Sequence, residues 1–242
     1  MPRGSIFPLL AFTVLAGTAA AQPPPPPPPP PGTGGASFPR FAPLEAKPAP
    51  GGPIAVPEGN GAPVITDGAF SPGEWEAAQR IPVGNSVVLY LLQWRDVVYV
   101  GIRGESGGSI GPSEVSLAAP GGPILKLHVS SQLAEATLSP GGEFSPMRMG
   151  FSSGWYANEQ RRDDALIARL QKEGRPPGEI MQAASYPSDG IELAVRRSKL
   201  AGDRWLLRLS ASAVDGSRPG MLTWPAGTEE KATAGWAELK LK

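Results

Sequence analysis

Short apolar stretches with a two-residue period recur along most of the chain after residue 62, and this period predicts β-strands. The stretches are rich in β-branched and aromatic residues, and turns containing Gly or Pro separate them. The predicted strands are residues 86–94, 97–103, 113–119, 124–130, 190–197, 204–214, 221–224 and 235–242. Many short strands joined by such turns predict an all-β fold, an antiparallel β-sandwich of the jelly-roll or immunoglobulin-like kind.

The first two strands predict a tight hairpin, because only Arg95-Asp96 separates them. In the second of these strands, one face carries Val98, Val100 and Ile102, and the other carries Val97 and Tyr99. Residues 124–130 alternate in the same way, with Leu and Val opposed to Lys126 and His128. This alternation predicts a strand that is buried on one face only.

Residues 158–172 depart from the β pattern and predict one helical insertion in the sandwich. Leu166, Ile167 and Leu170 form a narrow apolar stripe at helical spacing. Gly174 and two prolines follow the stripe, and such residues end helices.

The first 61 residues differ in composition and predict processing and linker segments. Residues 1–21 combine a basic start, an apolar stretch and a run of small residues, the layout of a secretory signal that is cleaved after Ala21. Residues 22–61 are rich in Pro and Gly and predict a disordered tether, stiffened by the polyproline run Pro23–Pro31. Residues 62–242 then predict one sandwich domain.

Charge and cysteine content exclude several classes of protein. The chain has 22 basic and 22 acidic residues, so no basic field favours nucleic acid as a partner. It has no Cys, so neither a disulfide nor a lipid-modified Cys is expected. No apolar run after the signal is long enough for a transmembrane segment. Export without disulfides indicates a secreted or periplasmic bacterial protein.

Motifs at both ends of the domain occur in an order that resembles a known family. The domain opens with an Ile-x-Asp-Gly turn followed by a Trp, and it closes with a Trp before a Gly-x-x-x-Leu-x-Leu strand. The matching residues are Asp67, Gly68, Trp75, Tyr99, Glu192, Ala194, Leu200, Trp224, Gly235, Leu239 and Leu241. This order resembles the family-nine carbohydrate-binding modules and the wider DOMON-like sandwiches, and the resemblance implies a β-sandwich that binds a ligand without catalysis.

The sugar-binding residues of that family do not carry over to this chain. Its sugar-binding members hold a sugar between two aromatic faces, one just before an Asp-x-Val-Glu strand and one in the loop before the last strand. Here Glu114 and Val115 match the strand, but residues 110–113 supply neither an aromatic residue nor an Asp. Residues 225–235, the loop before the last strand, also lack an aromatic residue.

Three functions follow from the resemblance and the composition. The first is a secreted, non-catalytic binding module whose ligand is unknown, such as an envelope or extracellular glycan. The second is an accessory domain that binds an envelope protein. The third is a DOMON-type domain for haem or another small ligand, in which His128 would pair with Met147 or Met149. The only His and the absence of Cys predict no metal site, and no cofactor is expected.

Asp67 and Glu74 are candidates for a general acid–base pair beside Trp75. The alternative is structural, with Asp67 ordering a turn, Glu74 in the first turn of a short helix and Trp75 plugging the core. We favour the structural interpretation, so no enzymatic activity is expected.

Aromatic and amide side chains near residue 156 form the best candidate for a ligand groove. The candidate residues are Trp155, Tyr156, Asn158, Arg161 and Tyr186. The alternative is that the two aromatic residues at 155 and 156 cap the sandwich and their polar neighbours are solvated.

Overall fold

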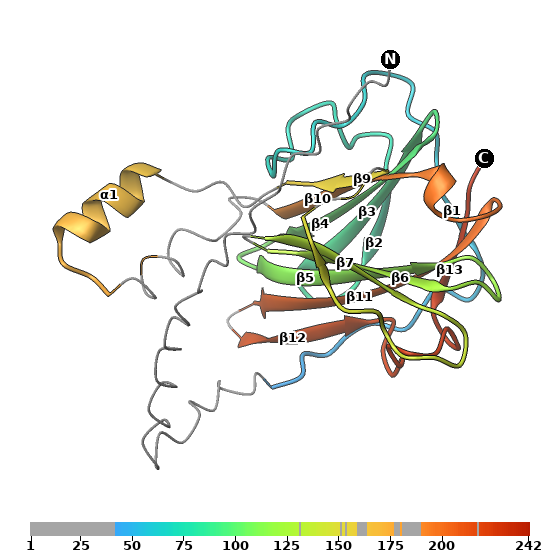
Figure 1. The fold of residues 1–242 in the computed structure, drawn as a ribbon. Coiled ribbons are helices and arrows are strands. Elements are labelled where there is room, and N and C mark those ends of the chain that lie inside the picture. The colour runs from blue at the N-terminus through green and yellow to red at the C-terminus, as the bar shows by residue number, and fades with distance from the viewer. Residues whose placement is uncertain are drawn as a thin grey trace, which may run out of the picture. The chain divides into compact units, whose positions relative to one another are not determined.

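The computed structural model describes residues 42–242, apart from residues 131, 151, 153, 159–163, 177–179, 181–189 and 217. Strands dominate this part of the chain (Figure 1). The strands are β1 (Ile54–Ala55), β2 (Gln79–Pro82), β3 (Val87–Trp94), β4 (Val97–Gly104), β5 (Ser109–Ala118), β6 (Ile124–Val129), β7 (Leu133–Leu138), β8 (Arg148–Met149), β9 (Trp155–Ala157), β10 (Gly190–Arg196), β11 (Arg204–Asp215), β12 (Arg218–Trp224) and β13 (Ala237–Lys240). The helices are α1 (Asp164–Lys172) and the 3-10 helix η1 (Arg197–Lys199).

The strands form two sheets. The eight-stranded sheet has the order β1-β13-β11-β5-β6-β7-β8, and β12 also pairs with β11. The five-stranded sheet has the order β2-β3-β4-β10-β9. Between the described strands, every pair is antiparallel except the parallel pair β1–β13. Figure 1 shows β3, β4, β9 and β10 above β5, β6, β11 and β12. The predicted all-β sandwich is therefore confirmed.

One hydrophobic core fills the space between the sheets, because alternate apolar residues of both sheets point into it. The fully buried side chains of this core include Leu89, Leu91, Ile102, Leu117, Leu127, Ile191, Leu207, Leu209, Trp205 and Trp224. The predicted hairpin is present, since β3 and β4 pair along their whole length on either side of Arg95-Asp96. Its predicted faces are also correct: Val100 lies in this core, and Tyr99 lies in a second cluster on the other face.

Residues 42–58 pack on the sandwich, although composition predicted a tether up to residue 61. The N–H of Leu44 donates to the carbonyl of Met221 (2.9 Å), and the N–H of Met221 donates to the carbonyl of Ala42 (3.1 Å). Further along, Ile54 pairs with Leu239 of β13, and Val56 is fully buried. This segment, which we call the strap, covers the outer edges of β12 and β13. Its apolar residues are spaced among prolines and glycines without a strand period, so composition alone could not separate it from the tether.

The helical insertion begins later than predicted. Helix α1 starts at Asp164, whereas the sequence pattern placed its start at Asn158. Asn158 instead follows β9, and its N–H donates to the carbonyl of Glu192 (3.1 Å), so sheet pairing overrides the helical pattern there. Residues 159–163 lie outside the described residues. In the described part of the chain, no helix has the length and apolar character that crossing a membrane requires.

Candidate functional site

Glu192 on β10 is the centre of a hydrogen-bonded clasp at the start of the domain. Its Oε2 accepts the backbone N–H groups of Asp67 (3.0 Å) and Gly68 (2.8 Å). Its Oε1 accepts the indole N–H of Trp75 (2.8 Å), whose ring is 6% exposed and stacks on Phe70 at 5.3 Å. Burial raises the pKa of Glu192 to about 7, against the opposing effect of these three hydrogen bonds. The carboxyl group is fully enclosed, so it holds the chain in place and faces no ligand.

Asp67 and Glu74, the candidate acid–base pair, make local hydrogen bonds in this turn. Asp67 Oδ1 accepts the N–H of Ala69 (2.9 Å), and Glu74 Oε2 accepts the N–H of Ser71 (3.1 Å). Carboxylates that accept nearby backbone N–H groups stabilise turns. These bonds support the structural interpretation of both residues.

Asn158, a candidate ligand residue, belongs to the same clasp. Its Oδ1 accepts the N–H of Glu192 (2.7 Å), and its Nδ2 donates to the carbonyl of Gly190 (3.2 Å). A Cβ on Gly68 would lie 2.6 Å from Asn158 Nδ2, and Gly68 has a φ of +82°, so this close approach requires glycine. Asn158 is 2% exposed, and its amide is therefore used inside the protein.

Trp155 and Tyr156 lie on opposite faces of the edge strand β9. Trp155 points inward, is 4% exposed and donates its indole N–H to Glu135 Oε2 (2.7 Å). Tyr156 points outward and is 39% exposed. Two neighbouring strand residues cannot line one groove with both rings, because their side chains project to opposite sides. The other two candidates, Arg161 and Tyr186, lie outside the described residues.

The clearest concentration of polar side chains lies elsewhere, on the outer face of the eight-stranded sheet. Strand register aligns these side chains in two rows across β11, β5 and β6. The first row is Arg208, Ser116 and Lys126, and the second row is Ser210, Glu114 and His128. We call these six residues the polar face. The alternate residues of the same strands supply the core, so the sheet separates an apolar inner side from a charged outer side.

Glu114 is the acidic centre of the polar face. Its Oε1 lies 3.7 Å from His128 Nδ1, and its Oε2 lies 3.8 Å from Lys126 Nζ. The contact with His128 and the charges of Lys126 and Arg208 lower the pKa of Glu114, although burial acts in the opposite direction. Glu114 is therefore ionised at neutral pH and offers carboxylate oxygens as hydrogen-bond acceptors.

Three atoms of the polar face are buried without a hydrogen-bond partner in the described part of the chain: Ser116 Oγ, His128 Nδ1 and Arg208 Nε. Leaving a buried polar group unpaired costs about 1–3 kcal/mol, so such groups are rare in native proteins. Two further atoms of this kind, the Nε1 atoms of Trp205 and Trp224, lie in the core between the sheets. The three on the polar face lie on the side of the eight-stranded sheet that faces away from the core, although each of these atoms is itself enclosed.

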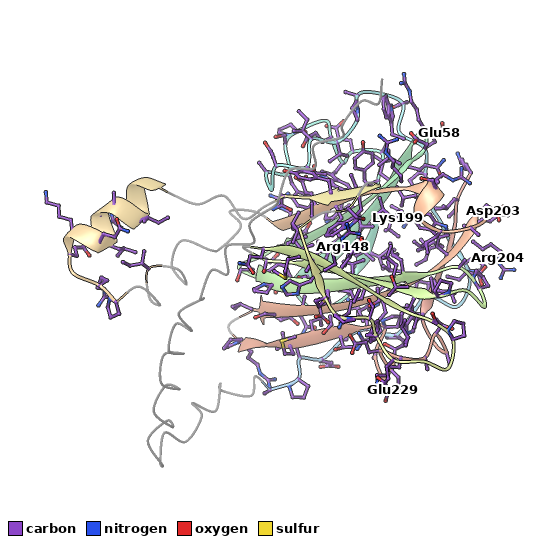
Figure 2. The ribbon with its side chains drawn as sticks, viewed as in Figure 1. Glu58, Arg148, Lys199, Asp203, Arg204 and Glu229 are labelled. Carbon is purple, nitrogen blue, oxygen red and sulfur yellow. The ribbon has the colours of Figure 1, made fainter. Side chains whose placement is uncertain are left out.

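A pocket of about 270 Å³ lies at the end of the same outer face. Residues of the β5–β6 turn, of the loop after β7 and of the β12–β13 loop line it. Ile124 and Leu138 form its apolar floor. They pair with each other across β6 and β7, on the same outer face as the next pair, Lys126 and Ala136. Lys126 also connects the polar face to the β12–β13 loop, because its Nζ lies 2.8 Å from Glu230 Oε1. Figure 2 labels the neighbouring Glu229 on this loop.

His128 and Met149, a candidate haem pair, lie in one row across β6, β7 and β8 with Ala134 between them. Residues in one such row project from the same face of a sheet, whereas two axial ligands approach an iron from opposite sides. Met147, the other candidate, is 39% exposed. Among the described residues, no group of three or more His, Cys, Asp or Glu side chains is placed to hold a metal ion.

The polar face could not be identified from the sequence, although part of its signal was present. The alternation in residues 124–130 placed Lys126 and His128 on an outer face. Each row, however, combines residues from three strands, and the pairing of β5 with β11 joins segments about ninety residues apart. Hydrophobic period indicates which side of a strand is buried but not which strands are neighbours.

Comparisons with known proteins return remote structural likenesses only. No protein-family model matches the chain, and no curated protein matches it by sequence. One similar structure is a "putative carbohydrate-binding protein" from Bacteroides uniformis, with 10% identity and a TM-score of 0.43, covering 82% of this chain and 100% of that one. Another is a family 9 carbohydrate-binding module from Caldicellulosiruptor kristjanssonii in complex with cellotriose, with 13% identity and a TM-score of 0.41, covering 79% of this chain and 94% of that one. At these values the ligand has to be argued from the residues of this chain.

Proposed function

We propose that this chain is a non-catalytic binding module that takes a glycan on its polar face. The observation that carries the proposal is the two rows of charged and hydroxyl side chains on one outer sheet face, in which Ser116 Oγ and Arg208 Nε are buried without a hydrogen-bond partner among the described residues. Glu114 supplies acceptors, and Arg208 and Lys126 supply donors. Sugar hydroxyls both donate and accept, so they suit a face of this mixed kind.

The adjoining pocket supports a sugar ligand in particular. Ligand sites combine apolar walls with a few polar groups that fix orientation. Here Ile124 and Leu138 contribute apolar atoms to the pocket lining, although both side chains are largely buried, and Ser139 and Thr233 line the same pocket.

The positions of the carboxyl groups support binding without catalysis. General acid catalysis needs a carboxyl group that keeps its proton near neutral pH and reaches the substrate. Glu192 has the raised pKa, but it is fully buried in the clasp. Glu114 reaches the outer face, but its pKa is lowered. Neither residue combines the two properties.

The binding proposal is tested by a glycan array followed by calorimetric titration of the best glycan. Glu114→Gln keeps the shape and removes the charge, and we expect it to weaken binding about tenfold or more, because hydrogen bonds to charged groups contribute about 1.5–3 kcal/mol. Asp96→Asn at the exposed β3–β4 turn is the matched control and should leave affinity unchanged. Silence on the whole array would instead favour the accessory, protein-binding function, and turnover of a chromogenic glycoside would contradict a non-catalytic role.

We also propose that the chain is exported by a bacterium to the periplasm or the medium. The signal-like composition of residues 1–21 and the absence of Cys support this. Expression of the whole chain in a bacterial host should give a mature protein that begins at Gln22, as measured by intact mass spectrometry. A cytoplasmic product that retains Met1 would contradict export.

A further inference from the structure

Arg208 differs from the other basic residues of the polar face because it has no acceptor. It lies on β11, is 8% exposed, and has a buried Nε without a hydrogen-bond partner. No hydrogen bond or ion pair joins Arg208 to the described residues. Arg204, four residues earlier on the same strand, provides the contrast: its Nε and Nη2 each lie 2.7 Å from Glu238 Oε1. Figure 2 labels Arg204 at the edge of the molecule.

The acidic groups near Arg208 are already engaged by other cations. Glu114 lies within 4 Å of both His128 and Lys126, and the charge of Arg208 only adds to the lowering of its pKa. Glu230 binds Lys126 at 2.8 Å. A guanidinium that is largely removed from water is costly unless an anion or several acceptors surround it. The polar face therefore holds one cation whose partner is not supplied by the described residues.

Ser116 lies directly beside Arg208 in the register of β5 and β11. Its hydroxyl is fully buried and also has no partner among the described residues. A guanidinium presents a planar fork of N–H donors, and this fork matches the two oxygens of a carboxylate.

We propose that the glycan bound by the polar face is acidic, and that the guanidinium of Arg208 binds the carboxylate of a uronic acid unit. This inference rests on the proposed binding function and specifies its ligand. Neutral hydroxyls would satisfy the donors of Arg208 but leave its charge unpaired, whereas a carboxylate satisfies both. Glu114 and Glu230 stay paired with His128 and Lys126. Neither acidic side chain therefore competes with the ligand's carboxylate for Arg208.

The test compares one oligosaccharide in two charge states on the full chain. Oligogalacturonides and their methyl esters share the same rings, and the ester removes only the negative charge. We expect calorimetric titration to show binding of the acid that is about ten- to a hundredfold tighter than binding of the ester, and that weakens as salt is raised. Oligoglucuronides and their esters give a second pair with different ring stereochemistry.

Variants then assign the difference to Arg208. Arg208→Gln removes the charge and the planar fork, so it should lose most of the preference for the acid over the ester, whereas Arg208→Lys keeps the charge and should retain part of that preference. Ser116→Ala should leave affinity for the acid nearly unchanged, because the Ser116 hydroxyl is enclosed and cannot contact the ligand. Arg204→Gln, on the same strand, is the matched control and should leave the preference intact, with folding of each variant checked by circular dichroism.

Two outcomes separate this inference from the function on which it rests. If the wild-type chain binds neutral glycans as well as acidic ones, or prefers sulfated glycans over carboxylated ones, the carboxylate inference is wrong while the binding function stands. If the chain binds neither neutral nor acidic glycans, the binding function itself is wrong. The comparison of acid with ester uses the wild-type chain, so it remains decisive even if the Arg208 variants do not fold.

Discussion

At the scale of single residues, Glu192 gives the domain a pH-dependent stability. Its pKa in the folded chain is about 7, above the ordinary value of 4.5, so the folded state binds this proton more tightly than the unfolded state. Stability should therefore fall as pH rises from about 4.5 to about 7. Glu192→Gln should remove this slope, and it should lower stability at pH 5 because an amide replaces one acceptor oxygen, by about 1–3 kcal/mol. Urea unfolding between pH 5 and 8, followed by tryptophan fluorescence, measures both effects.

Glu76→Gln is the control for that experiment, because Glu76 is an exposed carboxylate next to Trp75. It should keep the wild-type slope. An unchanged slope in Glu192→Gln would show that other groups set the pH dependence.

The same residue scale shows how far a site can be predicted from sequence. Trp75 was correctly predicted as buried: its large apolar ring packs in a hydrophobic cluster and is 6% exposed. Trp155 and Asn158 looked like ligand residues by type, yet both make hydrogen bonds inside the protein. Residue type alone could not reveal this, because Glu135 and Glu192, their partners, come from distant strands. Residue type could not identify Arg208 either. It lies on β11, where only the missing acceptor for its Nε distinguishes it from other strand residues.

At the scale of elements, the sequence predicts β3 to β6 and β10 to β13, and it misses β1, β2, β7, β8 and β9. β6 and β11 have clear alternation because one side of each faces the core, whereas β3 and β4 are apolar on both faces and were predicted from their β-branched and aromatic residues. In β7, Ala134 and Ala136 lie on the outer face of the sheet, and Glu135 and Thr137 lie on the other face. Neither face has a run of large apolar side chains, so the apolar and polar positions differ little. β9 has three residues and lies just before the predicted helix, so no strand was predicted there, and pairing with β10 makes it a strand. Such pairing is a tertiary effect and leaves little local signal.

At the scale of the whole molecule, the strap covers two strand edges of the eight-stranded sheet. The eight-stranded sheet would otherwise expose the outer edges of β12 and β13, whose free N–H and C=O groups invite pairing with other chains. Residues 42–44 bond to Met221 of β12, and Ile54–Ala55 pairs with β13. Gly220 permits this closure, because a Cβ there would lie 2.4 Å from the carbonyl oxygen of Ala42.

Gly220→Ala should therefore displace the strap from β12. We expect a loss of about 1–3 kcal/mol in the free energy of unfolding, the usual cost of an added methyl group in a filled space. We also expect association that grows with protein concentration, because the uncovered edge can pair between chains. Urea unfolding and light scattering across a concentration series measure the two effects. Gly111→Ala on β5 is the matched control, since a Cβ there has its nearest contact at 3.5 Å. Equal stability and equal monomer content in the two variants would mean that the strap does not protect the edge.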